Sequence, residues 1–327
     1  MNLIREISLP NGRRTQNLGF GCAGILRLPT AAQRRSLLAR AFDAGLTHFD
    51  VARSYGAGAA EGIVGKCFEG RRDSITLGTK FGFPCGVPSR KTVFVQSFGR
   101  WAVNLHPAFK RLAKKQSAPA TGDRHYDYSA DEMTRSLETS LRELRTDALD
   151  LFFVHEPRIN DTVTDDLAAA LRDALDAGKC GAFGVSGMPS DLLYFQKMQP
   201  ELFGGANQSN FRLGETPAPL TGMPYHGVFH VLAGTLPSCE TFLQQNPGSA
   251  KTWSEKLGLD LTQRENLATA IIAIALNEHP QGMVLFFTTK ARRIAPMVKR
   301  LRENSFSAEA LTEFRRVLHG REKPDAL

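Results

Sequence analysis

Short apolar segments alternate with stretches of helical patterning along most of the chain. The short segments are rich in β-branched and aromatic residues, which favour β-strands. Strands that alternate with helices imply a parallel sheet, and eight of them favour a closed α/β barrel of the (β/α)8 or TIM type. The eight predicted strands are residues 18–22, 47–51, 75–80, 149–155, 182–186, 203–208, 228–233 and 283–287.

Four of the predicted helices begin at a Ser or Thr that can cap them: Thr30, Ser129, Thr164 and Thr262. In three of the four, a Gln or Glu follows three residues later, which is the spacing of a capping box. Gly45 and Gly178 are expected to end the first and third of these helices, because glycine readily adopts the left-handed conformation of a helix end.

A β-hairpin is predicted before the first barrel strand, with its strands at residues 7–9 and 16–18. Asn11 and Gly12 lie between these strands, and this dipeptide favours a type I′ turn. We therefore expect an N-terminal hairpin ahead of the barrel.

One predicted connection is much longer than the others, namely residues 84–128, between the third strand and the next helix. Connections of about two to six residues are usual at this place. We expect the insertion to form amphipathic helices that pack as a lid on the mouth of the barrel, within a single domain spanning residues 1–327. The expectation rests on apolar residues at helix-like intervals: Phe94, Phe98, Trp101, Leu105 and Leu112.

Charge is distributed unevenly over the 327 residues, whose formal net charge is +8. Residues 84–125 contain eight Lys or Arg against one acidic residue, Asp123, so +7 of the +8 belongs to this segment. A basic character confined to one segment is weak support for nucleic-acid binding, and we expect no nucleic-acid partner. The basic residues of such a lid usually face solvent only, and the alternative is that a basic lid beside an active site attracts an anionic substrate.

Neither a membrane span nor a leader peptide is expected. The chain contains no run of about 18 apolar residues, and its first residues lack the long apolar stretch of a signal peptide. The five cysteines are scattered, odd in number and without a CxxC pair, which argues against a disulfide framework and a structural zinc site. These features favour a cytoplasmic protein.

Four polar residues lie at or just beyond the ends of neighbouring predicted strands: Asp50, Tyr55, Lys80 and His155. In a (β/α)8 barrel the carboxyl ends of the strands form the active site, so we expect these side chains to converge. A free tyrosine has a pKa of about 10, and a nearby ammonium lowers it. The arrangement therefore suits general acid catalysis of carbonyl reduction, with the hydride supplied by a cofactor.

Several segments resemble the aldo-keto reductase family. Residues 44–56 resemble its first signature, Glu61 and Gly65 follow at nearly its spacing, and Thr79 and Lys80 match its lysine segment. The resemblance covers nearly the whole chain. Its other matches are the histidine segment, with Ser136, Leu137, Leu141, Asp147, Asp150, Leu151, His155, Glu156 and Pro157, the fifth strand, with Gly184, Val185 and Ser186, and Gln208 in the sixth.

The resemblance implies a role for each matching residue. Tyr55 would donate the proton, Lys80 and Asp50 would tune it, and His155 would position the substrate oxygen. The cofactor would be NADP(H), or alternatively NAD(H). Its expected contacts are Gly21, then Ser186 and Gln208 at the nicotinamide carboxamide, and Thr288, Lys290 and Arg293 at the 2′-phosphate, beside a helix whose N-terminal dipole favours phosphate.

The chain departs from the family pattern at several positions. The family usually has an aromatic residue after the seventh strand that stacks on the nicotinamide, whereas residues 233–235 offer none and Phe211 is one substitute. The other departures are Gly187, where asparagine is usual, Phe287, where a small or basic residue is usual, and Pro296 and Met297, where a Glu-Asn pair is usual.

Three functions remain open from the sequence. The first is reduction of an aldehyde or ketone with NADPH, or the reverse oxidation. The second is an NAD-linked sugar or polyol dehydrogenase on the same barrel, and the third is a non-catalytic cofactor-sensing or protein-interaction subunit. The sequence has all four polar residues at the strand ends, namely Asp50, Tyr55, Lys80 and His155, and this favours an enzyme acting on a small carbonyl or alcohol.

Overall fold

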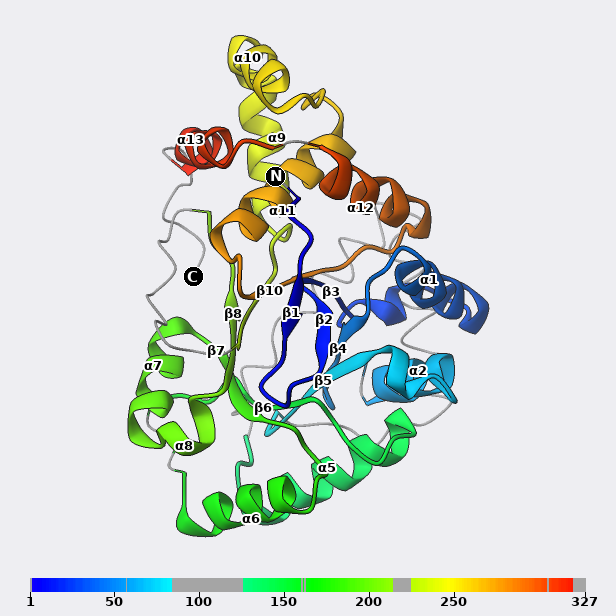
Figure 1. Cartoon of the computed structure of the whole chain (residues 1–327), viewed down its shortest axis with the longest axis vertical. Coiled ribbons are helices and arrows are strands. Elements are labelled where there is room, and N and C mark those ends of the chain that lie inside the picture. Colours follow the sequence, from blue (N-terminus) through cyan, green and yellow to red (C-terminus); the bar gives the residue numbers. More distant parts are fainter. Residues whose placement is uncertain are drawn as a thin grey trace, which may run out of the picture.

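The computed structural model describes residues 2–56, 58–83, 126–159, 161, 163–213, 225–304 and 306–319. Eight parallel strands close into a barrel in the order β10-β3-β4-β5-β6-β7-β8-β9, so the predicted (β/α)8 fold is confirmed (Figure 1). The strands are β3 (Leu18–Gly21), β4 (His48–Asp50), β5 (Thr76–Phe81), β6 (Leu151–His155), β7 (Phe183–Gly187), β8 (Ala206–Asn210), β9 (Tyr225–Phe229) and β10 (Met283–Phe286).

Helices surround the barrel on all sides in Figure 1. The longer ones are α1 (Ala31–Asp43), α2 (Ala59–Phe68), α5 (Ala130–Leu144), α6 (Asp165–Asp176), α7 (Pro189–Met198), α9 (Thr235–Gln245), α10 (Pro247–Leu257), α11 (Arg264–Glu278), α12 (Ile294–Glu303) and α13 (Ala308–His319). The short ones are α8 (Pro200–Phe203) and the 3-10 turns η1 (Ile25–Arg27), η2 (Arg72–Ser74) and η3 (Ala291–Arg293).

Three of the four predicted helix starts are confirmed. Thr30 and Gln33 form both bonds of a capping box, the Ser129 hydroxyl accepts from the backbone of Glu132, and Thr164 caps α6. The prediction for α11 is wrong, because Thr262 precedes the cap residue. Its hydroxyl donates to the Asp260 carboxylate and so takes part in the turn before the helix.

The N-terminal hairpin is confirmed, but its turn is not of type I′. Strands β1 (Glu6–Ser8) and β2 (Arg14–Gln16) pair antiparallel, so Leu18 lies in the barrel and not in the hairpin. A type I′ turn needs two residues with positive φ, and in this loop only Gly12 has one, at 79°. Ile7 and Leu9 pack in the same apolar cluster as barrel residues such as Leu151, which places the hairpin over the amino-terminal end.

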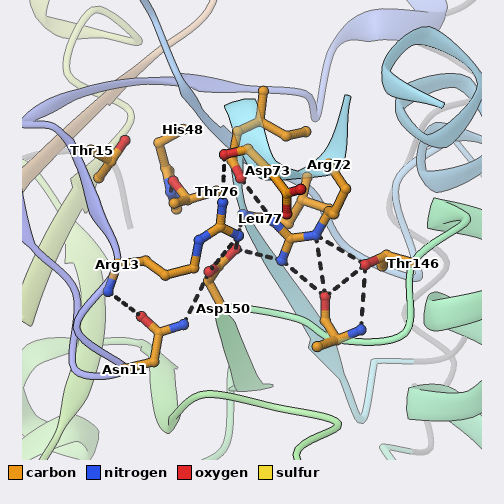
Figure 2. Close-up of polar contacts among 12 residues, drawn as sticks. Asn11, Arg13, Thr15, His48, Arg72, Asp73, Thr76, Leu77, Thr146 and Asp150 are labelled. Atoms are coloured by element: carbon orange, nitrogen blue, oxygen red, sulfur yellow. Dashed lines mark hydrogen bonds and ion pairs between the residues drawn. The ribbon is translucent and has the colours of Figure 1, made fainter. Parts of the chain in front are cut away.

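A buried carboxylate fastens the hairpin to that end of the barrel. Asp150, which is fully buried, accepts hydrogen bonds from Asn11 and Arg13 of the hairpin loop (Figure 2). It also accepts from Arg72 in η2 and from the backbone of Leu77 in β5, both at 2.7 Å. Because the amino-terminal end is closed in this way, access to the interior is left to the carboxyl end.

Two predicted strands were misplaced. Phe203 ends the short helix α8, which Pro200 begins, and β8 starts only at Ala206. Strand β9 ends at Phe229, four residues before the predicted end, because His230 leaves it with a φ of 60°. Short apolar runs do not distinguish a strand from a buried helix or turn, which explains both errors.

The expected lid lies almost wholly outside the described residues, so its structure stays a prediction. The two ends of the insertion do meet, because the Asp127 backbone donates to the Gly82 carbonyl at 3.0 Å and Phe83 packs edge-on against Tyr126. Within the ranges that the structure describes, no helix combines the length and the apolar character that crossing a membrane requires.

Candidate active site

A buried ion pair forms the base of the site. Lys80 on β5 donates to both carboxylate oxygens of Asp50 on the adjacent strand β4, at 2.6 and 2.7 Å, and to the Val51 carbonyl at 2.9 Å. The Lys80 residue is 2% exposed and Asp50 4%. The three bonds use every proton of the ammonium, so its charge is satisfied without water.

Tyr55 and His155 complete the predicted group of four. Tyr55 lies in the turn after β4, and its ring centroid is 6.0 Å from that of His155 at the end of β6. The Lys80 ammonium lies 5.3 Å from the centre of the Tyr55 ring. The structure therefore brings Asp50, Tyr55, Lys80 and His155 together at the carboxyl end of the barrel.

The pKa of Tyr55 moves in the direction opposite to that expected from the sequence. Burial of the hydroxyl and the nearby Asp50 carboxylate raise the pKa of Tyr55 well above its usual value. Lys80 does not offset this, because its ammonium is bound to Asp50 and Val51. Tyr55 is therefore a neutral phenol that keeps its proton at physiological pH.

His155 is neutral in this environment. Burial, and secondarily the Lys80 charge, lower the pKa of His155 to about 3. Its Nδ1 is buried and has no hydrogen-bond partner among the residues described. The next residue, Glu156, has a left-handed φ of 53°, an uncommon conformation for a non-glycine residue that concentrates at functional sites. A neutral imidazole can bind a substrate oxygen without adding charge.

Buried histidines predict a loss of stability in acid. Burial lowers the pKa of His48, inside the barrel, to about 4, and His155 has a pKa of about 3. The unfolded chain protonates these side chains below about pH 6.5, while the folded chain does not, so stability falls as the pH drops below that value. At pH 5 the expected loss is about 2 kcal/mol for each histidine.

Urea unfolding at pH 7.5 and pH 5.0 measures this effect, with His48→Gln as the comparison. In the variant, the difference in unfolding free energy between the two pH values should shrink by about 2 kcal/mol. An unchanged difference would show that the pKa of His48 is the same in the folded and the unfolded chain, and a larger difference that folding raises it.

A cavity of about 790 Å³ lies at the carboxyl end of the barrel, and Asp50 and Tyr55 form part of its lining. One end is lined by Gly21, Asp50, Tyr55 and Phe229. The volume and the cationic far end fit a nicotinamide dinucleotide with its phosphates. That far end is lined by Arg27 of η1, Gln263, Arg264 and Glu265 at the start of α11, Arg292 and Arg293 of η3, and Pro296, Met297 and Arg300 of α12.

The predicted cofactor residues fall into two groups. Gly21, Thr288 and Arg293 line the cavity, whereas Lys290 is exposed and is not part of its lining. Ser186 and Gln208 are buried beneath it. The Ser186 hydroxyl donates to the Gln208 amide oxygen at 3.3 Å, and the Gln208 amide donates to Asp50 at 2.8 Å. In this structure Gln208 therefore binds the Asp50 carboxylate, and Ser186 binds Gln208.

The sequence reasoning missed an aromatic residue at the end of β9. Phe229 lines the cavity beside the ion pair, while Phe211 is buried and does not. The signal was present in the alternation of Tyr225, Gly227 and Phe229 along β9, whose inward positions recur with period two. The predicted strand, residues 228–233, starts three residues after the observed β9 and therefore does not contain this alternation. Arg27, Arg292 and Arg300 were missed as well.

Comparisons with known proteins agree with this geometry. Residues 17–211 match the profile of the Aldo/keto reductase family. The curated protein "Aldo-keto reductase yakc [NADP(+)]" of Schizosaccharomyces pombe is 28% identical over 174 residues, which cover 52% of this chain and 42% of that protein. "Uncharacterized oxidoreductase YcsN" of Bacillus subtilis is 30% identical over 160 residues, covering 47% and 43%. The matched segments thus span less than half the length of these relatives.

Solved structures with the same fold cover almost the whole chain. An aldo-keto reductase from Klebsiella pneumoniae in complex with NADPH superposes with a TM-score of 0.67 at 20% identity, covering 99% of this chain and 98% of that one. The glycerol dehydrogenase AKR11B4 from Gluconobacter oxydans superposes with a TM-score of 0.70 at 18% identity, covering 98% of this chain and 97% of that one. With the family profile matching more than half of its residues, the chain belongs to the aldo/keto reductase family.

Proposed function

We propose that this protein is an oxidoreductase that interconverts an aldehyde or ketone and the corresponding alcohol with NADP(H). The observation that carries the proposal is that Asp50 and Tyr55, which contact Lys80 and His155 respectively, line a dinucleotide-sized cavity with a cationic far end. Bound in this cavity, a reduced nicotinamide cofactor supplies the hydride that becomes attached to the carbonyl carbon.

Tyr55 is the proposed proton donor. Its raised pKa keeps the phenol protonated until the carbonyl oxygen acquires alkoxide character, which makes that oxygen the stronger base. The proton then passes from the Tyr55 hydroxyl to the oxygen, and the alcohol is formed. The phenolate left behind, whose ring centre lies 5.3 Å from the Lys80 ammonium, is a strong base and is reprotonated from solvent.

His155, Asp50 and Lys80 prepare this transfer. His155 is neutral and packs against Tyr55, so we assign it the positioning of the substrate oxygen between the two rings. Asp50 holds the Lys80 ammonium in place and neutralises it in the resting site. Gln208 fixes the second carboxylate oxygen, which keeps the pair from reorienting.

The cofactor contacts are proposed from the lining of the cavity. A side chain at Gly21 would enter open space in front of the Phe286 carbonyl, so glycine there leaves room for a flat group. Phe229, in this lining, offers a ring for the nicotinamide. Ser186 and Gln208 are not in the lining, and they would hold the carboxamide in exchange for their mutual bond. Thr288, Arg293 and the neighbouring arginines would face the phosphates, with Lys290 nearby.

Titration with NADPH and NADH tests the proposal, followed by an assay of generic aldehydes and alcohols in both directions. We expect saturable binding at micromolar concentration and turnover of at least one substrate. Nucleotide binding without any turnover would favour the cofactor-sensing alternative. Turnover only with NAD⁺ and a polyol would favour the dehydrogenase alternative, and absence of binding at millimolar concentration would refute the proposal.

A further inference from the structure

The cationic far end of the cavity, where the adenosine of the proposed cofactor would lie, contains an ion pair that the family resemblance does not explain. Glu265, the second residue of α11, and Arg293, the last residue of η3, both line the cavity. Their side chains meet at 2.6 Å between Arg293 Nη2 and Glu265 Oε1. Arg293 is one of the three residues, with Thr288 and Lys290, that the family resemblance places at the 2′-phosphate, and this ion pair neutralises its positive charge.

The carboxylate of Glu265 stays negatively charged at this end of the cavity. A hydrogen bond from its own backbone amide and the charge of Arg293 lower the pKa of Glu265, so it is ionised at physiological pH. The side chain is 45% exposed, and solvent therefore screens the charge only in part. A phosphate dianion bound beside Arg293 would face this negative charge, whereas a free ribose hydroxyl could donate a hydrogen bond to it.

We propose that Glu265 determines cofactor selectivity, because its carboxylate disfavours a 2′-phosphate beside Arg293 and accepts a hydrogen bond from a free 2′-hydroxyl. The inference rests on the proposed function, since it requires a nicotinamide dinucleotide in the cavity. Several arginines at this end of the cavity would by themselves favour NADPH over NADH. The Glu265 carboxylate makes this preference smaller.

Other arginines explain why a phosphorylated cofactor can still bind. Arg264, which also lines the cavity, is paired with Glu240. Among the described residues, by contrast, Arg27, Arg292 and Arg300 have no acidic partner, and all three line the same end. Their charges attract any phosphate of the cofactor, while Glu265 acts specifically against the one at the 2′ position.

The test compares Glu265→Gln with Glu303→Gln by calorimetric titration. Glu303 ends α12, is exposed and does not line the cavity, so its variant makes the same charge change without touching the site. The probes are NADPH, NADH, adenosine 2′,5′-bisphosphate and AMP, and the last two report on the adenosine end alone.

Glu265→Gln should tighten binding of NADPH and of the 2′,5′-bisphosphate about five- to tenfold, as expected for removal of one partly screened like charge. Affinity for NADH and AMP should stay within about twofold, because the amide oxygen still accepts from the hydroxyl. The gain should shrink in about 0.5 M salt, where the Debye length falls to a few ångströms, and Glu303→Gln should show no gain.

Equal changes for the nucleotides with and without a 2′-phosphate, or no change for either, would overturn the inference while leaving the proposed function in place. Failure of the wild-type protein to bind any of the four probes would overturn both. Thermal unfolding of the two variants confirms that each is folded, so a lost or gained affinity cannot be attributed to misfolding.

Discussion

Replacing Tyr55 with Phe should lower kcat by at least about a hundredfold, the usual contribution of a positioned general acid. The variant keeps the ring that packs against His155 and lies over the Lys80 ammonium, and it loses only the hydroxyl. Affinity for NADPH should remain within about twofold, because the phenolic proton is used in the reaction and not in cofactor binding. Steady-state kinetics and a cofactor titration of the same preparation measure both quantities.

Tyr128→Phe is the matched control for this experiment. The Tyr128 hydroxyl donates to the backbone carbonyl of His155 at 2.9 Å, so this variant removes a second partly buried tyrosine hydroxyl next to the same histidine. Its turnover should fall by less than about tenfold, since it only loosens a hydrogen bond. Equal losses in the two variants, or near-normal turnover in Tyr55→Phe, would show that Tyr55 is not the proton donor.

Replacing Asp150 with Ala should destabilise the fold by about 3 to 5 kcal/mol, as breaking a buried charge pair commonly does. The carboxylate is fully buried and is bonded to Arg13, Arg72, Asn11 and the backbone of Leu77. Figure 2 shows these groups converging on it from the hairpin loop, η2 and β5. Its removal leaves two guanidinium groups, the Asn11 side-chain amide and the Leu77 backbone N–H without their shared acceptor.

Chemical denaturation of Asp150→Ala and of Asp73→Ala measures the effect. Asp73 is exposed, lies beside Arg72, and contributes only its backbone carbonyl to Arg13, so its substitution should cost less than about 0.5 kcal/mol. A loss below about 1 kcal/mol in Asp150→Ala would mean that the arginines reach solvent or another acceptor, and that the hairpin is not held by this carboxylate.

Much of the fold followed from local patterns. Strand and helix alternation predicted the closed barrel, and Thr30, Ser129 and Thr164 cap their helices as expected, because caps depend on residues only three positions apart. The boundaries of β8 and β9 did not follow, because Phe203 and Val231 belong to apolar runs that suit a strand, a short helix or a buried turn equally well.

The sequence by itself determined that Asp50, Tyr55, Lys80 and His155 share one end of the molecule, since the carboxyl ends of parallel barrel strands must converge. Only the tertiary structure decided the charges and partners within that site. Burial raises the pKa of Tyr55, Gln208 binds Asp50, and Glu265 neutralises Arg293. These outcomes depend on how far each side chain is removed from solvent and on which side chains from distant parts of the sequence come into contact. The spacing of residues along the chain gives no information on either.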